Sequence, residues 1–306
     1  MILCAGEALI DMLPREATDG GNAFQPHAGG AVFNTAIALG RLGSSTGFFT
    51  GLSTDLFGEI LTEGLAASNV DSSFAHRSDR PTTLAFVTLT DGHASYAFYD
   101  ENTAGRMLTD ADLPKLDESV KALFFGGISL VVEPCASAYE ALAAREADKR
   151  IIMLDPNVRP SFIKDEAVYR ARIQRMMGRA DIVKVSDEDL KWLMDGKGLA
   201  EGAADVMALG PKVVFVTRGA DGVTAYTKTF DVSVASERVA VVDTVGAGDT
   251  FNAGVLAALD DAGLLSDAGI ESITEEDLVA AMSLGARAAA VTVSRAGANP
   301  PRRDEL

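Results

Sequence analysis

Cysteine, histidine and tryptophan are scarce in this chain, which has 306 residues and contains two, three and one of them respectively. Cys4 and Cys135 lie far apart and share no spacing motif, so we expect two buried thiols in a reducing cytoplasm. The three histidines are scattered and form no metal-ligand pattern. A disulfide-stapled fold and a histidine-ligated metal centre are therefore excluded.

Long apolar runs are also missing. No window reaches the roughly 18 uninterrupted apolar residues of a membrane span, so we expect no membrane partner. The apolar start of the chain is interrupted by Glu7 and Asp11 and has no basic region before it, which argues against a signal peptide. The final residues 303–306 imitate a retention tail of the endoplasmic reticulum, a match without meaning in a protein that lacks a secretory signal.

Basic residues are the third shortage. The chain has 27 Lys and Arg against 44 Asp and Glu, a formal net charge of −17. Nucleic acids and anionic membranes are bound through clustered cations, so both are excluded as partners. The same balance makes phosphate binding look improbable at first sight. A hydrophobic fraction of 47% and this length suit one soluble α/β domain.

The second half of the chain alternates short apolar runs with helical patterns. Such alternation predicts right-handed crossovers and a mainly parallel sheet covered on both faces. The expected strands are 1–10, 122–127, 151–155, 181–186 and 213–217, with a hairpin at 223–227 and 232–236. The expected helices are 31–42, 134–147, 166–178, 187–209, 250–261 and 275–291.

An antiparallel flap is predicted outside this pattern. Residues 84–90 and 94–100 alternate in polarity and flank Asp91-Gly92, a pair typical of a tight hairpin turn. Residues 13–28 are too polar and too rich in glycine for a core element. We therefore predict one domain over 1–306, with a small β-sheet lid made of about 12–28 and 82–100.

The most informative segment runs from Asp243 to Phe251 and enters a helix. Small residues at 246–248 let the backbone approach a ligand, and amides at a helix N-terminus attract phosphate or developing negative charge. Asp249 at that point suits a base that takes a proton from an attacking hydroxyl. The alternative is a glycine-rich turn with an aspartate cap. P-loop, dinucleotide-binding and Gly-x-Ser-x-Gly motifs are absent from the sequence.

Two ordered signatures give the chain a family resemblance. The first comprises Gly29-Gly30-Ala31 with Asn34, residues 39–43, Gly51 and residues 55–58; the second is 243–251. Together they resemble the ribokinase-like (PfkB-type) carbohydrate kinases from end to end. The resemblance implies a three-layer α/β/α fold with a β-sheet lid, and ATP-dependent phosphoryl transfer to a sugar hydroxyl.

The resemblance also implies roles for individual residues. Asp249 would be the base, and the amides of Gly246, Ala247 and Gly248 would form an anion hole. Sugar ligands would be Asp11, Gly29, Gly30, Asn34 and Arg159. The nucleotide side would include Lys184, Ser186, Thr217, Gly219, Gly222 and Asn252. Taken alone, several of these positions fit ordinary turn and helix-cap chemistry equally well.

Metal sites are implied with one departure from the family pattern. Many relatives carry Asn-x-x-Glu near the magnesium ion, whereas this chain has Ser186-Asp187-Glu188-Asp189. Glu188 and Asp189 would serve Mg²⁺, directly or through water, unless they form only a solvated acidic helix start. Asp243, Val245 and Ala298 match a monovalent-cation (K⁺) site of some relatives.

The expected substrate is a neutral sugar. In ketodeoxygluconate kinases, an arginine that would pair with the sugar acid stands where this chain has Asp100. Residues 155–159 and 184–188 look most like those of fructokinases, with ketodeoxygluconate kinase, ribokinase and nucleoside kinase as alternatives. A non-catalytic sugar or nucleotide sensor on the same fold is the rival of another class. Flaps of this kind pair across a two-fold axis in many relatives, which predicts a homodimer through the lid.

Overall fold

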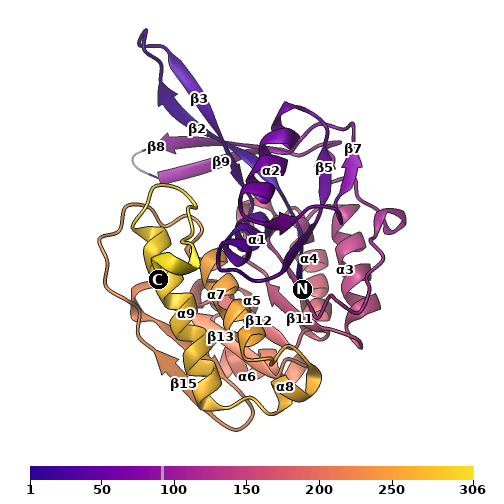
Figure 1. Ribbon diagram of the computed structural model, residues 1–306, viewed down its shortest axis with the longest axis vertical. Helices are drawn as coiled ribbons and strands as arrows, with labels where there is room; N and C mark the ends of the chain where they lie inside the picture. Colours follow the sequence, from indigo (N-terminus) through magenta and orange to yellow (C-terminus); the bar gives the residue numbers. More distant parts are fainter. Residues whose placement is uncertain (91–92) are drawn as a thin grey trace.

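The computed structural model describes residues 1–90 and 93–306, and side chains at 88–90 and 93–96 are not described. The Asp91-Gly92 turn predicted from the sequence lies outside the described residues. A sheet of nine strands forms the centre, with strand order β15-β14-β13-β12-β11-β10-β1-β4-β6 (Figure 1). Its strands are β1 Ile2–Ala5, β4 Thr46–Phe49, β6 Val70–Asp71, β10 Ala122–Gly126, β11 Ile151–Asp155, β12 Ile182–Ser186, β13 Val213–Thr217, β14 Val223–Tyr226 and β15 Asp231–Val234.

The sheet is parallel from β6 to β13, and β14 and β15 add an antiparallel edge. Side chains of successive residues point to opposite faces, so Ile2 and Cys4 of β1 join one core cluster while Leu3 and Ala5 join the other. Burial on both faces explains why these strands read as unbroken apolar runs. The mainly parallel α/β/α architecture expected from the sequence is therefore confirmed.

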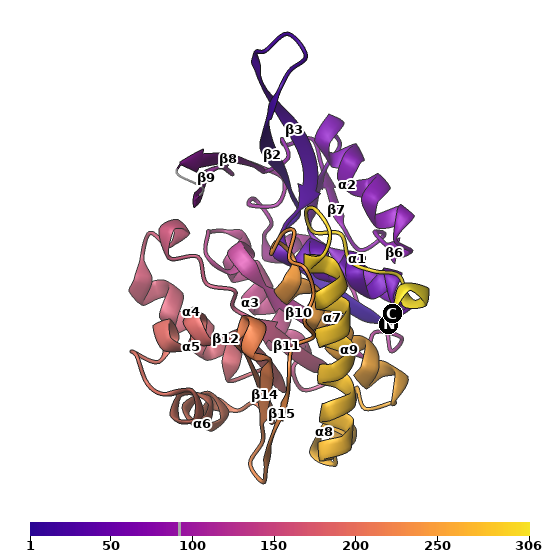
Figure 2. The same cartoon turned by 90° about the vertical axis from the view of Figure 1, so that its left-hand side faces the viewer.

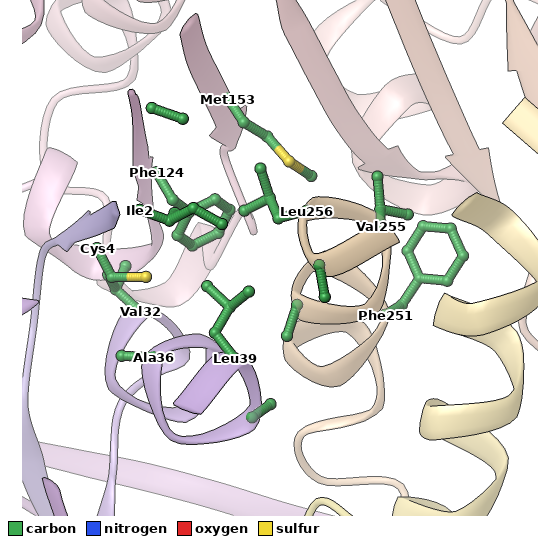
Figure 3. Packing of buried hydrophobic residues seen from close by; sticks show 14 of the residues in the cluster. Ile2, Cys4, Val32, Ala36, Leu39, Phe124, Met153, Phe251, Val255 and Leu256 are labelled. Carbon is green, nitrogen blue, oxygen red and sulfur yellow. The ribbon is translucent and has the colours of Figure 1, made fainter. Parts of the chain in front are cut away.

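Helices cover both faces (Figure 2). The core residues of α1, α2, α7, α8 and α9 belong to one cluster, and those of α3, α4, α5 and α6 belong to the other. Figure 3 shows the first cluster, where Val32, Ala36 and Leu39 of α1 and Leu256 of α7 meet Ile2 and other residues of the strands. The helices are α1 Ala31–Arg41, α2 Leu56–Ala67, α3 Cys135–Glu146, α4 Glu166–Met177, α5 Asp187–Leu193, α6 Leu199–Leu209, α7 Ala247–Asp261, α8 Asp267–Glu271 and α9 Glu275–Val293.

The lid is a second sheet with strand order β3-β2-β8-β9, which stands apart from the main sheet in Figures 1 and 2. Its strands are β2 Leu9–Glu16, β3 Asn22–Gly29, β8 Leu84–Thr90 and β9 His93–Tyr99. A separate two-stranded sheet is formed by β5 Gly51–Ser53 and β7 His76–Ser78, which lie between β3 and β8 in the sequence. Among the described residues, no helix is long and apolar enough to cross a membrane.

Three sequence expectations require correction. The predicted first strand 1–10 is two strands in different sheets, because the chain bends at Gly6 and Glu7. A Cβ atom on Gly6 would lie 2.5 Å from Val32. The lid segment expected at about 12–28 is longer than predicted: β2 and β3 pair in register from Leu9–Gly29 to Glu16–Asn22. The helix expected at 187–209 is interrupted, since Asp195 and Gly196 adopt positive φ angles of 52° and 82°.

Candidate active site

A cavity of about 350 Å³ lies at the carboxyl ends of the central strands, beneath the lid. Ligands of open α/β sheets bind at this edge. The cavity collects residues that the sequence placed in separate motifs, and their side chains or backbones line its wall: Asp11, Gly30, Asn34, Arg159, Lys184, Val245, Gly246, Ala247, Gly248 and Asp249. The two signatures of the sequence therefore meet in one place.

Asp249 is the buried carboxylate at the centre of this cavity. It occupies the first turn of α7 and is only 8% exposed. The Asn34 Nδ2 donates to Asp249 Oδ2 over 2.9 Å, and the Thr35 hydroxyl contacts the Asp249 carbonyl oxygen at 3.3 Å. Burial raises the pKa of Asp249 to about 7, while the Asn34 bond lowers it and the nearby Asp155 raises it further. A carboxylate with that pKa can accept a proton near neutral pH.

The turn before Asp249 forms the N-terminus of α7. Gly246 has φ 78°, in the left-handed region, and a Cβ there would lie 2.8 Å from the Cβ of Ala298. The Ala247 N–H points at the Thr244 carbonyl oxygen over a long 3.4 Å. Among the described residues, no side chain caps this helix end. The first amides of a helix have no partner within the helix, so this turn can receive negative charge.

Asp11 and the two glycines of the first signature meet at the base of the lid. A Cβ on Gly29 would lie 2.3 Å from Asp11 Oδ2, so only glycine leaves room for that carboxylate. Gly30 has φ 108° and is the N-cap residue of α1. Burial raises the pKa of Asp11 to about 6. Asp11 and Phe98 share the lid face that looks into the cavity, because Asp11 pairs with Ala85 and Ala85 pairs with Phe98.

Lys184 brings a positive charge to the same wall. Its Nζ lies 3.0 Å from Asp155 Oδ2 and 3.0 Å from the position a Cβ on Gly248 would take. Burial lowers the pKa of Lys184, but Asp155, Asp189 and Asp249 outweigh it and raise the pKa overall. The amine is therefore held as a cation against the N-terminal turn of α7.

Asn252, expected on the nucleotide side, lies behind the cavity wall, against Asp155. Its side chain is fully buried, and its Nδ2 donates to Asp155 Oδ2 over 2.7 Å. It does not line the cavity. Its contact holds Asp155, the partner of Lys184, from the side of α7.

The other residues expected near the nucleotide lie at neighbouring strand ends. Ser186 pairs with Thr217 in register, at the ends of β12 and β13. Gly219 and Gly222 have φ angles of 52° and 88° in the tight turn that leads into β14. None of these four residues lines the 350 Å³ cavity; Ser186 and Thr217 lie at the same edge of the sheet as the cavity.

The acidic start of α5 offers one carboxylate toward the site. Glu188 is exposed, whereas Asp189 is partly buried, and burial together with Asp155 raises the pKa of Asp189 to about 6. No group of three or more His, Cys, Asp or Glu residues in the described part of the chain could hold a metal ion by itself. Asp189 offers carboxylate oxygens, the ligand type that hard divalent cations prefer.

Residues matched to a monovalent-cation site also lie together. Asp243 accepts the Val245 N–H over 3.0 Å and the Gly297 N–H over 2.9 Å. Ala298 abuts Gly246. Because the Asp243 carboxylate is bound to these two amides, a cation here would depend on backbone carbonyls.

Asp100, which the sequence linked to the choice of a neutral sugar, has an ion-pair partner in the structure. Asp100 is not among the residues that line the 350 Å³ cavity. Its Oδ1 lies 3.2 Å from the Arg106 guanidinium, at the root of the lid. Arg159, by contrast, lies exposed on the cavity wall, as the sequence placed it.

Two acidic residues of the cavity wall were not among the site residues predicted from the sequence. Glu7 follows β1 and Asp155 ends β11, and both are buried carboxylates that line the cavity. An acidic residue at the end of a buried apolar run is the signal that could have identified both, since strand ends converge at one edge of the sheet.

Comparisons with known proteins agree with this geometry. Residues 1–305 match the model of the pfkB family carbohydrate kinases. A fructokinase of Rhizobium leguminosarum bv. trifolii is 57% identical over 283 residues, covering 91% of this chain and 85% of that protein.

Solved structures of carbohydrate kinases are also similar to this chain. A fructokinase from Xylella fastidiosa with bound ATP has a TM-score of 0.88 and 31% identity, with 97% of this chain and 93% of that chain covered. A fructokinase from Vibrio cholerae O395, with fructose, ADP and a calcium ion, has a TM-score of 0.84 and 26% identity, with 97% and 94% covered. By sequence and by fold, the chain belongs to the pfkB family of carbohydrate kinases.

Proposed function

We propose that this carbohydrate kinase is an ATP-dependent fructokinase. The observation that carries the chemistry is the buried Asp249, held by Asn34 beside the open N-terminus of α7. The choice of fructose is supported by the relative at 57% identity and by the solved fructokinases. Ketodeoxygluconate kinase, ribokinase and nucleoside kinase remain alternatives within the family.

The proposed step is an in-line transfer of the γ-phosphoryl group. Asp249 takes the proton of a sugar hydroxyl, and that oxygen forms a bond to the γ-phosphorus. The bond between the γ-phosphorus and the bridging oxygen breaks, and ADP leaves with the electron pair. Amides at 246–248 and the Lys184 ammonium stabilise the charge on the phosphoryl oxygens.

The sugar would lie between the lid and the body. Asp11, with Gly29 and Gly30, and Asn34 would hold its hydroxyls from one side, and Arg159 from the other. This assignment is supported by their common position on the cavity wall or, for Gly29, against Asp11. ATP would extend toward Ser186, Thr217, Gly219 and Gly222, whereas Asn252 would act only through Asp155 and Lys184.

Mg²⁺ would supply charge neutralisation of the phosphates. Asp189, which lies near Lys184 and Asp155, is a better candidate to hold it than the exposed Glu188. A K⁺ ion would fit the carbonyls around Asp243, Val245 and Ala298. Two buried free thiols, Cys4 and Cys135, favour work in a reducing cytoplasm.

We also propose a homodimer formed through the lid. The lid face turned away from the cavity carries Phe24, Phe86 and Tyr99, whose rings contact in series at 5.0 and 5.4 Å. Phe24 is 44% exposed and Tyr99 is 62% exposed. An aromatic face of this kind on a small sheet suits a second copy of the chain.

An ATP/ADP-coupled assay over a panel of sugars tests the function directly. We expect ADP release with fructose and much less with ketodeoxygluconate, ribose or a nucleoside. A preference for one of those three would replace fructose by that substrate. Sugar or nucleotide binding without any ADP release would point to the non-catalytic sensor.

A further inference from the structure

Glu7 is a buried carboxylate on the cavity wall that the proposed phosphoryl transfer does not use. It lies between β1 and β2, the point where the chain passes from the main sheet to the lid. Its Oε1 accepts the Ala31 N–H over 2.9 Å, and its Oε2 accepts the Ser129 N–H over 3.2 Å. Glu7 therefore joins the start of α1 to the turn that follows β10.

The bond to Ala31 replaces a missing helix cap. The N-cap residue of α1 is Gly30, which has no side chain, and the first turn contains no acidic residue. Helix N-termini are stabilised by a carboxylate that accepts their unpaired amides. Glu7 supplies that carboxylate from 24 residues earlier in the sequence.

Two glycines with positive φ leave space for Glu7, one beside its carboxylate and one beside its backbone. A Cβ on Gly127, with φ 67°, would lie 2.1 Å from Glu7 Oε1, and a Cβ on Gly30 would lie 2.9 Å from the Glu7 carbonyl oxygen. Three chain segments thus pack around one side chain. Moving that side chain would release the N-terminal turn of α1 on one side and the 127–129 turn on the other.

The same turn of α1 carries the proposed sugar site. Gly30 directly precedes Ala31. Asn34, three residues after Ala31, donates to the Asp249 carboxylate. We propose that Glu7 is a positioning residue, which fixes the first turn of α1 so that Gly30 and Asn34 meet the sugar and Asp249 in reactive geometry. This role rests on the proposed phosphorylation of a sugar, and it acts on the sugar side of the cavity rather than on the nucleotide side.

The test compares Glu7→Gln with Glu146→Gln. Glutamine keeps the shape of Glu7, but its NH₂ group cannot accept a second amide N–H. Glu146 is a suitable control because it is similarly buried at 4% exposure and bonded to Arg145 and Arg150, and it does not line the cavity. Both variants lose one buried, doubly bonded carboxylate.

For Glu7→Gln we expect a sugar KM raised at least about 5-fold and a kcat lowered about 10-fold, with the ATP KM within about twofold of wild type. Hydrogen exchange of the amides in 31–35 should accelerate. For Glu146→Gln all three kinetic constants and that exchange should stay near wild type. Equal behaviour of the two variants, or an ATP KM that rises as much as the sugar KM, would overturn the proposal.

A second variant removes the other half of the bond. Ala31→Pro deletes the donated N–H at the first helical position, where proline is well tolerated, and its ring carbon takes the place of that hydrogen and pushes the Glu7 carboxylate away. We expect the same raised sugar KM and lowered kcat with an unchanged ATP KM, and unchanged sugar kinetics would contradict the proposal.

The wild-type protein is first assayed on the sugar panel. A preference other than fructose refutes the fructokinase assignment alone, and the variants are then measured with the preferred sugar. The hydrogen-exchange rates of the amides in 31–35 are measured without substrate, so they test the contact of Glu7 with α1 independently of the sugar.

Discussion

The side-chain amide of Asn34 and the carboxylate of Asp249 lie 2.9 Å apart, although 215 residues separate them in the sequence. This bond joins the first turn of α1 to the first turn of α7 and orients the carboxylate oxygen that would take the proton. Each residue belongs to one of the two signatures of the chain. Their contact turns two sequence motifs into one site.

Asp249→Asn should lower kcat by at least about 10²-fold, because the amide cannot accept the hydroxyl proton. Binding of ATP, measured by calorimetry, should persist. Asp261→Asn, at the far end of the same helix and paired with Arg303, is the matched control and should keep normal turnover. A turnover of Asp249→Asn close to wild type would remove Asp249 from the role of base.

The pH dependence of kcat/KM should show one acidic limb near pH 7. Asp249 must be ionised to accept a proton, and its pKa is raised to about 7, chiefly by burial. Activity should therefore fall about tenfold per pH unit below 7 and level off above it. An acidic limb near pH 4, the range of an ordinary aspartate, would contradict this environment.

Asp249→Asn should also stabilise the protein at alkaline pH. The pKa of this group is about 7 in the folded state against an ordinary value of 3.8, so the folded chain binds its proton more tightly than the unfolded chain. Folding stability then decreases as pH rises from about 4 to about 7, and the full penalty applies above 7. Asparagine has no such penalty. The Tm of the variant should exceed that of wild type by a few degrees at pH 8, with the difference vanishing near pH 4.

Gly29→Ala should damage sugar binding specifically. The added Cβ would lie 2.3 Å from Asp11 Oδ2 and must displace that carboxylate. We expect a sugar KM raised about 10-fold or more, with an unchanged ATP KM. Gly198→Ala is the control, since a Cβ there meets nothing within 4 Å. If the two variants have the same kinetics, Asp11 is not a sugar ligand.

The lid dimer can be broken at its aromatic face. Phe24→Asp combined with Tyr99→Asp places two charges on the exposed face, and light scattering should then report a monomer where wild type is a dimer. Val168→Asp, at an exposed position of α4, should leave the dimer intact. A wild-type protein that is itself monomeric would end the dimer proposal.

Much of the fold could be read from the sequence because parallel strands buried on both faces leave unbroken apolar runs. Residues 122–126 and 151–155 are examples, and both became strands of the central sheet. Patterns without that signature were predicted less completely: a lid segment was expected at about 12–28, but not the pairing of its two strands. β2 and β3 lie in an exposed lid, where polar and glycine-rich residues pair through their backbones.

The sequence by itself determined the central sheet, through its unbroken apolar runs, and the two signatures with Asn34 and Asp249, whose resemblance to known carbohydrate kinases indicated the family. Only the tertiary structure decided which side chains share a cavity. It paired Asp100 with Arg106, buried Asn252 behind Asp155, and brought Glu7 to the start of α1. Such contacts depend on how strand ends and turns converge in space, which no local pattern encodes.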